Sequence, residues 1–135
     1  MEGVSKSDLD NFLESKGFIL KQWQHSREFF GSFFEIWQSN VFKIQFVQDR
    51  SIRSMDISSL SDDDNWFDLE LIKCLIENNN KLNKHMSESD FITFFKVHFK
   101  EILTLFSPKN YSRTQKSLEL IRDARARQMF PDLYK

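Results

Sequence analysis

Residues 29–57 read FFGSFFEIWQSNVFKIQFVQDRSIRSMDI, and this stretch decides the fold. Strand-forming residues dominate three short segments of it: 32–38, 41–48 and 52–57. Polar residues separate these segments, first at Ser39-Asn40 and then at 49–51, and residues of this kind favour tight turns. The stretch therefore predicts three short strands joined by two tight turns, which is a β-meander.

The middle strand of this meander has two unlike faces. Because successive side chains of a strand point to opposite faces, Phe42, Ile44 and Phe46 share one of them. Lys43 and Gln45 point to the other face, which is more polar. One apolar and one mixed face are typical of an antiparallel sheet that is packed on one side only. An apolar layer must cover the first face, and the second half of the chain supplies it.

A further strand is expected before the meander, over residues 18–25. There we expect Ile19 and Trp23 to face the core, with Phe18 and Leu20 on the opposite side. The sheet is thus predicted to contain about four antiparallel strands.

Apolar residues at spacings of three and four predict four helices. The helical segments lie between Ser7 and Gly17, over 66–78, over 87–106 and over 110–128. Gly17 is placed to end the first helix in the left-handed conformation, and Asp64 or Asn65 is expected to cap the second. Together these segments predict a single α+β domain over residues 1–135, an antiparallel sheet with helices packed on one face.

The composition bounds the class of protein. The chain has 15 Phe and is 40% apolar, enough for a single core, and it holds one cysteine, Cys74. One cysteine cannot form an intramolecular disulfide framework and fits a reducing compartment. The first ten residues are polar and acidic, unlike a signal peptide, and no apolar run approaches the ~20 residues of a membrane span. We therefore expect a cytoplasmic protein that does not enter a membrane.

The net charge of −1 conceals an uneven distribution along the chain. Residues 1–80 hold 8 Lys and Arg against 14 Asp and Glu, whereas residues 81–135 hold 11 against 6. Two explanations stay open. Either the two halves pair with each other within the fold, or the acidic half offers a face to a basic partner.

Motifs for catalysis, cofactors and metals are missing from the sequence. The three glycines are isolated and the three histidines scattered, so neither a phosphate loop nor zinc spacing is present. Asp62, Asp63 and Asp64 are adjacent, but a calcium loop needs ligands at alternating positions and a distal Glu. We expect Cys74 to be a small buried apolar residue and His98 to be hydrogen-bonded at the edge of the core. These features favour a binding protein over an enzyme, with no catalytic, cofactor or metal site.

Three segments resemble a group of small bacterial proteins without assigned enzymatic activity: Phe30-Gly31-Ser32, Phe46-Val47-Gln48-Asp49-Arg50 and Trp66-Phe67-Asp68-Leu69. In that group a strand ends in Asp-Arg-Gly and Trp-Phe-Asp opens a helix, and here Ser51 stands where the glycine would be. A chain of this size and composition is also similar to immunity proteins of bacterial toxin systems, including contact-dependent growth inhibition. The resemblance implies a protein that binds and neutralises a cognate toxin domain.

The resemblance and the acidic half together give a hypothesis for the binding surface. Its members are carboxylates that end or follow the meander: Asp56, Asp62, Asp63, Asp64, Asp68 and Glu70. An acidic patch would steer a basic toxin domain and occlude its active site. Trp23 and Trp37 are each either a core residue or an aromatic anchor for the partner.

Three alternatives stay open. The last helix carries basic residues suited to phosphate contact: Arg113, Lys116, Arg122, Arg125 and Arg127. Glu119 and Asp123 dilute this charge, and so nucleic-acid binding or a regulatory role is the second hypothesis. A homodimer through the mixed face of the sheet is another. An enzyme would need a pocket that unites His98, Cys74 and a carboxylate.

Overall fold

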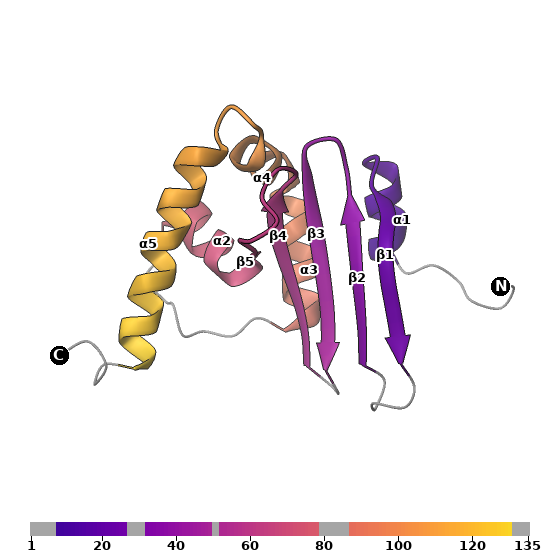
Figure 1. The fold of residues 1–135 in the computed structure, drawn as a ribbon, viewed down its shortest axis with the longest axis horizontal. Helices are drawn as coiled ribbons and strands as arrows, with labels where there is room; N and C mark the ends of the chain where they lie inside the picture. The colour runs from indigo at the N-terminus through magenta and orange to yellow at the C-terminus, as the bar shows by residue number, and fades with distance from the viewer. Residues whose placement is uncertain (1–7, 27–31, 50–51, 79–86, 131–135) are drawn as a thin grey trace, which may run out of the picture.

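The computed structural model describes residues 8–26, 32–49, 52–78 and 87–130. The strands of this part of the chain are β1 (Ile19–Ser26), β2 (Ser32–Gln38), β3 (Phe42–Asp49), β4 (Ile52–Ser59) and β5 (Phe67–Asp68). Its helices are α1 (Asp8–Ser15), α2 (Leu69–Glu77), α3 (Glu88–Val97), α4 (Phe99–Phe106) and α5 (Tyr111–Met129). None of these helices is both long enough and apolar enough to cross a lipid bilayer. The predicted α+β class is confirmed (Figure 1).

The five described strands form one antiparallel sheet in the order β1-β2-β3-β4-β5. Each strand pairs with the next one in the chain, so the predicted meander is present and β1 extends it at one edge (Figure 1). The expectation of about four strands is wrong by one. The fifth strand, β5, is two residues long and pairs with Asp56 and Ile57 of β4. Two residues are too few to show the alternation that predicts a strand.

The same short strand changes where the next helix begins. The expected start at residue 66 is wrong, because β5 occupies the first positions of that segment and α2 begins only after Asp68. Asp68, rather than Asp64 or Asn65, caps the helix: the backbone N–H of Leu71 donates to Asp68 Oδ1 at 3.0 Å. A carboxylate in this position satisfies one of the free N–H groups of the first turn.

Some predicted features lie outside the described residues. They are Ser7 at the start of the first helical segment, the turn residues Arg50-Ser51 and the Phe30-Gly31 pair of the first resembling segment. The other predicted turn is displaced by one position. The N–H of Ser39 donates to the carbonyl of Phe42 at 3.0 Å, so the central residues are Asn40 and Val41. The Ser39 hydroxyl accepts from the N–H groups of Val41 and Phe42, which fixes Ser39 as the residue before the turn.

The first helix ends as predicted, since Gly17 has a φ of +87°, a region that glycine enters without steric penalty. The chain then enters β1, where the register shifts after Leu20. This β-bulge reverses the alternation and puts Ile19 and Trp23 on opposite faces of the sheet. Their expected inward placement is wrong, because they are 63% and 64% exposed, and Phe18 is buried instead.

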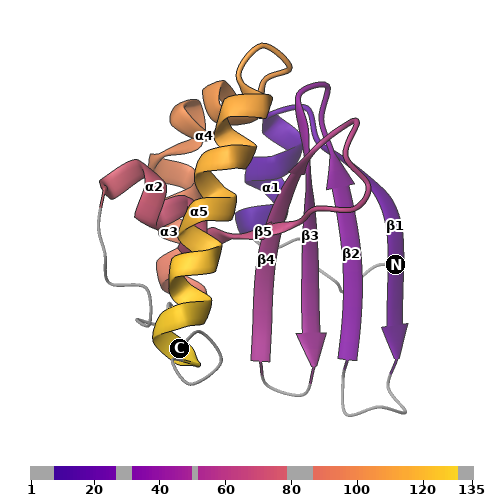
Figure 2. The same ribbon diagram turned by 60° about the vertical axis from the view of Figure 1, so that its left-hand side comes forward.

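One face of the sheet, here called the covered face, packs against α1, α3 and α4 (Figures 1 and 2). Phe42 is fully buried on this face, and its ring centroid lies 5.2 to 6.4 Å from those of Phe18, Phe95, Phe99 and Phe106. Edge-to-face and tilted ring contacts add to the burial of each Phe, which contributes roughly 1.5–3 kcal/mol. The predicted apolar layer over this face is confirmed.

The segment 87–106, expected as one helix, is divided at His98 into α3 and α4. His98 has φ −102° and ψ 20°, outside the helical region, and its N–H still donates to the carbonyl of Phe94 at 2.9 Å. Phe95 and Phe99, on either side of the break, both reach the core. The segment therefore keeps inward-facing apolar residues on both sides of the break, although it forms two helices rather than the single one expected.

The opposite face, here called the open face, has none of the described helices over it (Figure 2). The helices α2 and α5 stand beyond β5, at one end of the sheet (Figures 1 and 2). Residues 60–66, which connect β4 to β5, lie over the upper part of the open face (Figure 2). We call this connection the acidic loop, because it contains Asp62, Asp63 and Asp64.

Candidate partner-binding surface

The centre of the open face holds apolar and amide side chains. Strand pairing places Ile36, Gln45 and Asp56 in one row across β2, β3 and β4, and puts Phe34 beside Val47 in the next row. All five of these residues are partly buried by their neighbours on the sheet. Apolar groups with few charges are typical of the cores of protein interfaces.

Two carboxylates face each other at the β5 side of the open face, where Asp56 is paired with Asp68. Arg125 of α5 binds both oxygens of Asp68, with Nη1–Oδ1 at 3.1 Å and Nη2–Oδ2 at 2.8 Å. Such bidentate pairs are among the stronger hydrogen-bonded contacts in proteins. Burial acts to lower the pKa of Arg125, but the hydrogen bonds and charge of Asp68 outweigh burial and raise it. The oxygens of Asp68 therefore serve the fold, as helix cap and as partner of Arg125.

The carboxylate of Asp56 has fewer polar partners than that of Asp68. The side chain of Gln45, directly opposite on β3, donates a hydrogen bond to it. Burial, and after it the charge of Asp68, raise the pKa of Asp56 to about 6, and Gln45 and Arg125 oppose this only in part. Asp56 is thus ionised at neutral pH in a place that disfavours its charge.

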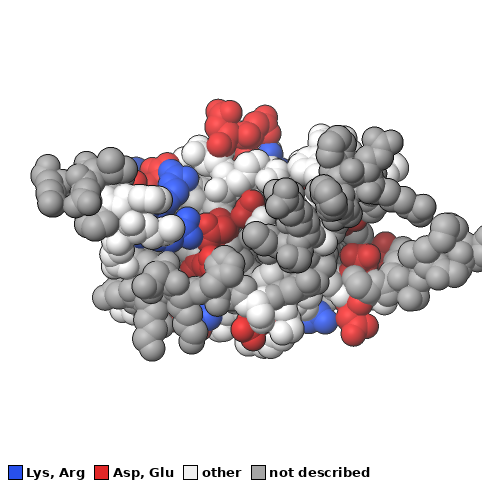
Figure 3. All heavy atoms as spheres, turned by 90° about the horizontal axis from the view of Figure 1, so that it is seen from below, with Lys and Arg blue, Asp and Glu red and all other residues white. Residues whose placement is uncertain are grey.

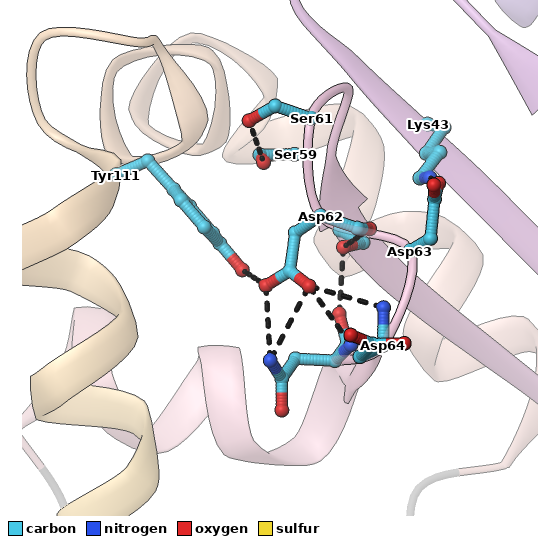
Figure 4. Close-up of polar contacts among 9 residues, drawn as sticks. Lys43, Ser59, Ser61, Asp62, Asp63, Asp64 and Tyr111 are labelled. Atoms are coloured by element: carbon cyan, nitrogen blue, oxygen red, sulfur yellow. Dashed lines mark hydrogen bonds and ion pairs between the residues drawn. The ribbon is translucent and has the colours of Figure 1, made fainter.

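Asp62 organises the acidic loop (Figure 4). Its carboxylate accepts from the Tyr111 hydroxyl at 2.6 Å and from the backbone N–H groups of Asp64 and Asn65, each at 3.1 Å. The Ser58 hydroxyl lies 2.9 Å and 2.6 Å from the carbonyl oxygens of Asp62 and Asn65, which ties the loop to β4. Burial alone would raise the pKa of Asp62. The hydrogen bonds that its carboxylate accepts from Tyr111, Asp64 and Asn65 outweigh burial and lower this pKa. Asp62 is therefore an internal support rather than a free charge.

Asp63 and Asp64 are the exposed carboxylates of the loop. The Asp63 side chain is 87% exposed, although its Oδ1 lies 2.8 Å from Lys43 Nζ (Figure 4). Lys43 is nearly buried beneath the loop, with its ammonium 5.3 Å over the Trp66 ring. The loop thus covers a lysine of the open face and presents two carboxylates to solvent.

The six predicted acidic residues do not form one cluster. The structure divides them among three places: Asp56 and Asp68 on the sheet, Asp62, Asp63 and Asp64 in the loop, and Glu70, partly buried, in the first turn of α2. In Figure 3 acidic side chains appear in several separate places, some of them beside basic side chains. The predicted surface is thus a set of small charged places around the open face.

Three residues of this region are missing from the predicted site: Gln45, Tyr111 and Arg125. The partner of Gln45 follows from the register of the meander, so the alternation pattern could have identified it. Tyr111 and Arg125 lie 49 and 57 positions from Asp62 and Asp68, and no local pattern links residues at such separations.

The basic helix α5 turns two of its five named cations inwards. Arg125 binds Asp68, and the Arg122 guanidinium lies 5.3 Å over the Phe67 ring. Arg113 and Lys116 are exposed. The Arg125–Asp68 pair joins the basic second half of the chain to the acidic first half, as the first explanation of the charge distribution expects.

The residues considered for catalysis lie apart from this surface or are committed elsewhere. Cys74 is partly buried on α2, and burial raises the pKa of its thiol, which leaves it protonated and weakly nucleophilic. His98 Nδ1 lies 2.6 Å from Glu101 Oε1, and its ring centroid is 4.4 Å from that of Phe94, at the edge of the core as predicted. Within the described ranges, no group of three or more His, Cys, Asp or Glu is arranged to hold a metal ion.

A pocket of about 590 Å³ opens beside the acidic loop. Apolar side chains form much of its lining, including Leu60 and Phe106, and the Asp62–Tyr111 pair stands in its wall. Neither Cys74 nor His98 lines it. It is therefore not the pocket that an enzyme built on those two residues requires.

The two tryptophans lie in different environments, one buried and one exposed. Trp37 is 4% exposed, and its Nε1–H donates to Glu35 Oε1 at 3.0 Å, so it is a core residue. Trp23 is exposed on the edge strand β1. Its pairing with Glu35, which in turn lies opposite Phe46, puts Trp23 on the covered side of the sheet and away from the open face.

Searches of protein-family models, curated proteins and solved structures found no match for this chain. Its function must therefore be inferred from the geometry and charge of the open face and the acidic loop.

Proposed function

We propose that this chain is an immunity protein that binds and neutralises a bacterial toxin domain in the cytoplasm, by binding rather than by catalysis. The observation that carries the proposal is the acidic loop. Asp63 and Asp64 are exposed, Asp62 holds them in place, and they stand over a sheet face that no described helix covers. Charges that are already positioned lose little conformational entropy on binding.

The loop and the open face would contribute differently to binding. Exposed carboxylates attract a basic domain from a distance, and this attraction is screened by salt. Asp63 and Asp64 would therefore mainly raise the association rate. The open face supplies contact area, with Phe34, Ile36 and Val47 at its centre. A toxin domain with a basic active site, such as one that acts on nucleic acid, would be occluded by a surface of this kind.

The alternative functions have less support. A basic nucleic-acid surface on α5 is reduced, because Arg122 and Arg125 turn towards Phe67 and Asp68. A homodimer through the open face would have to accommodate the acidic loop of each copy, which lies over the upper part of that face (Figure 2).

The test is affinity capture of the tagged protein from its native cells, read by mass spectrometry, and then binding and inhibition assays with the purified toxin domain. The variant combines Asp63→Lys with Asp64→Lys. The matched control combines Asp8→Lys with Asp90→Lys, which reverses two exposed carboxylates on α1 and α3, on the other side of the sheet. Both variants change the net charge equally, and circular dichroism checks that both fold.

We expect the native and control proteins to capture one toxin-like domain, and the loop variant to bind it about tenfold or more weakly, mainly through slower association. Equal binding by the loop variant would exclude the acidic loop as the interface. Capture of nucleic acid alone, or of no toxin-like domain, would refute the immunity function.

A further inference from the structure

Among the described residues of the open face, Asp56 is a carboxylate without a cation of its own. Asp56 and Asp68 face each other beside the guanidinium of Arg125, which directs two hydrogen bonds to Asp68. Lys43, which the alternation of β3 places on the same face, is bound to Asp63 at 2.8 Å. Within the described part of the open face, the charge balance around Asp56 is therefore negative.

The groups around Asp56 support its carboxylate without neutralising it. Gln45 donates a hydrogen bond from the neighbouring strand, and Ser54, two residues earlier on β4, is uncharged. The raised pKa of Asp56, which burial and Asp68 cause, is the expected consequence of a partly buried and undercompensated charge. A cation brought within hydrogen-bonding distance would stabilise the ionised form.

We propose that Asp56 is the docking point for a lysine or arginine side chain of the protein partner. This inference rests on the proposed function, since it names the group of the open face that recognises the toxin domain. The surroundings also suit the stem of such a side chain, because Ile36 lies in the same row and Val47 in the next. Lys and Arg commonly lay their methylene stems on apolar surface while the charged head keeps a polar partner.

The other predicted carboxylates suit this role less well. Asp62 and Asp68 already hold Tyr111 and Arg125. Asp63 and Asp64 are exposed, and a fully hydrated ion pair contributes only about 0–1 kcal/mol. Asp56 is partly buried beside Asp68, whose carboxylate takes both hydrogen bonds of Arg125, so a partner without a cation would leave the charge of Asp56 undercompensated, and this penalty gives selectivity.

Solution NMR with small probes tests the docking point without the partner. Isotope-labelled protein is titrated with N-acetyl-arginine amide, N-acetyl-lysine amide and N-acetyl-citrulline amide, which is a neutral isostere of the first. We expect the two cationic probes to shift the amide signals of Asp56, Gln45 and their neighbours, and the citrulline probe to bind about tenfold more weakly. Asp56→Asn should lose the cationic preference, whereas Asp64→Asn should keep it.

Several results would overturn the docking point: equal shifts from the arginine and citrulline probes, shifts centred on residues 60–66, or unchanged probe binding by Asp56→Asn. The toxin domain then separates the two proposals. If Asp56→Asn binds it as tightly as the native protein does while the loop variant fails, the docking point is refuted and the immunity function stands. If the probes bind at Asp56 but no toxin domain is found, the cation site stands and the immunity function is refuted.

Discussion

The covered and open faces are built from alternate residues of the same strands, yet they hold side chains in different ways. On β3, Phe42 and Ile44 are fully buried beneath helices, whereas Gln45 and Val47 are only partly buried. The covered face excludes water and depends on volume and packing. The open face keeps polar groups in specific hydrogen bonds, such as those between Asp68 and Arg125. The two faces of one sheet thus differ: packed volume stabilises the covered face, and the face that we propose binds the partner depends on polar contacts.

The largest effect should come from emptying the covered face. Phe42→Ala removes a ring that contacts four others and should lower the free energy of unfolding by about 3–5 kcal/mol. Phe34→Ala on the open face should lower it by about 1 kcal/mol, because part of that ring is already in water. Urea unfolding of both variants measures the difference. Equal losses would show that the two faces are packed alike.

The next effect concerns Asp68, the polar support of the open face. Asp68→Ala removes both the cap of α2 and the partner of Arg125, and should lower the free energy of unfolding by about 2–3 kcal/mol. Asp68→Asn keeps a capping oxygen and removes only the charge, so its loss should be about half as large. Thermal and urea unfolding compare the two variants. If they lose the same stability, the cap contributes nothing.

Asp56→Asn should stabilise the protein at neutral pH. The pKa of Asp56 is raised from 3.8 to about 6 in the folded state, so its ionisation destabilises the fold above about pH 6 and has no such effect below pH 3.8. At pH 7 we expect a gain of about 1–2 kcal/mol, below the full value for such a shift because the face is open to solvent. Relative to this variant, the native protein should lose stability between about pH 4 and 6.

Urea unfolding from about pH 4 to pH 7, at concentrations where the chain is monomeric, measures this difference. Parallel curves for the native protein and Asp56→Asn would contradict the assignment of a destabilising charge to the open face.

The smallest effect on stability should come from Asp63→Asn. The Asp63 side chain is 87% exposed, and an ion pair so open to water contributes little, so the loss should stay below about 0.5 kcal/mol. Urea unfolding checks the stability, and stopped-flow binding to the toxin domain should still show slower association. A stability loss above about 1 kcal/mol would mean that the Lys43–Asp63 contact supports the fold rather than the encounter with a partner.

The covered face follows well from the sequence. Alternation along β3 predicts that Phe42, Ile44 and Phe46 share a buried face, and the structure confirms it. Apolar residues at spacings of three and four along 87–106 predict a helix with one inward face, which includes Phe95 and Phe106, and both are buried. These predictions succeed because the repeat of a strand or a helix can be recognised within one short segment of the sequence.

The candidate surface could be predicted less well from the sequence. The set of acidic residues includes both Asp56 and Asp68, but their pairing depends on β5, a strand too short to leave a pattern. Ile19 is misplaced for a related reason, since the bulge after Leu20 interrupts the alternation in β1 and puts Ile19 on the open face, in register with Gln38 and Lys43. Each error arises where one or two residues depart from the period of the surrounding element.

The order of residues is enough to give the α+β class, the two unlike faces of the sheet and the acidic first half, because periodicity and composition are local properties. It does not show which carboxylates are already bound to other side chains of the same chain. Packing assigns Asp62 to Tyr111 and Asp68 to Arg125, across 49 and 57 positions of the chain. Contacts at such separations depend on how α5 docks beside the sheet, and this docking decides that Asp56 keeps an undercompensated charge.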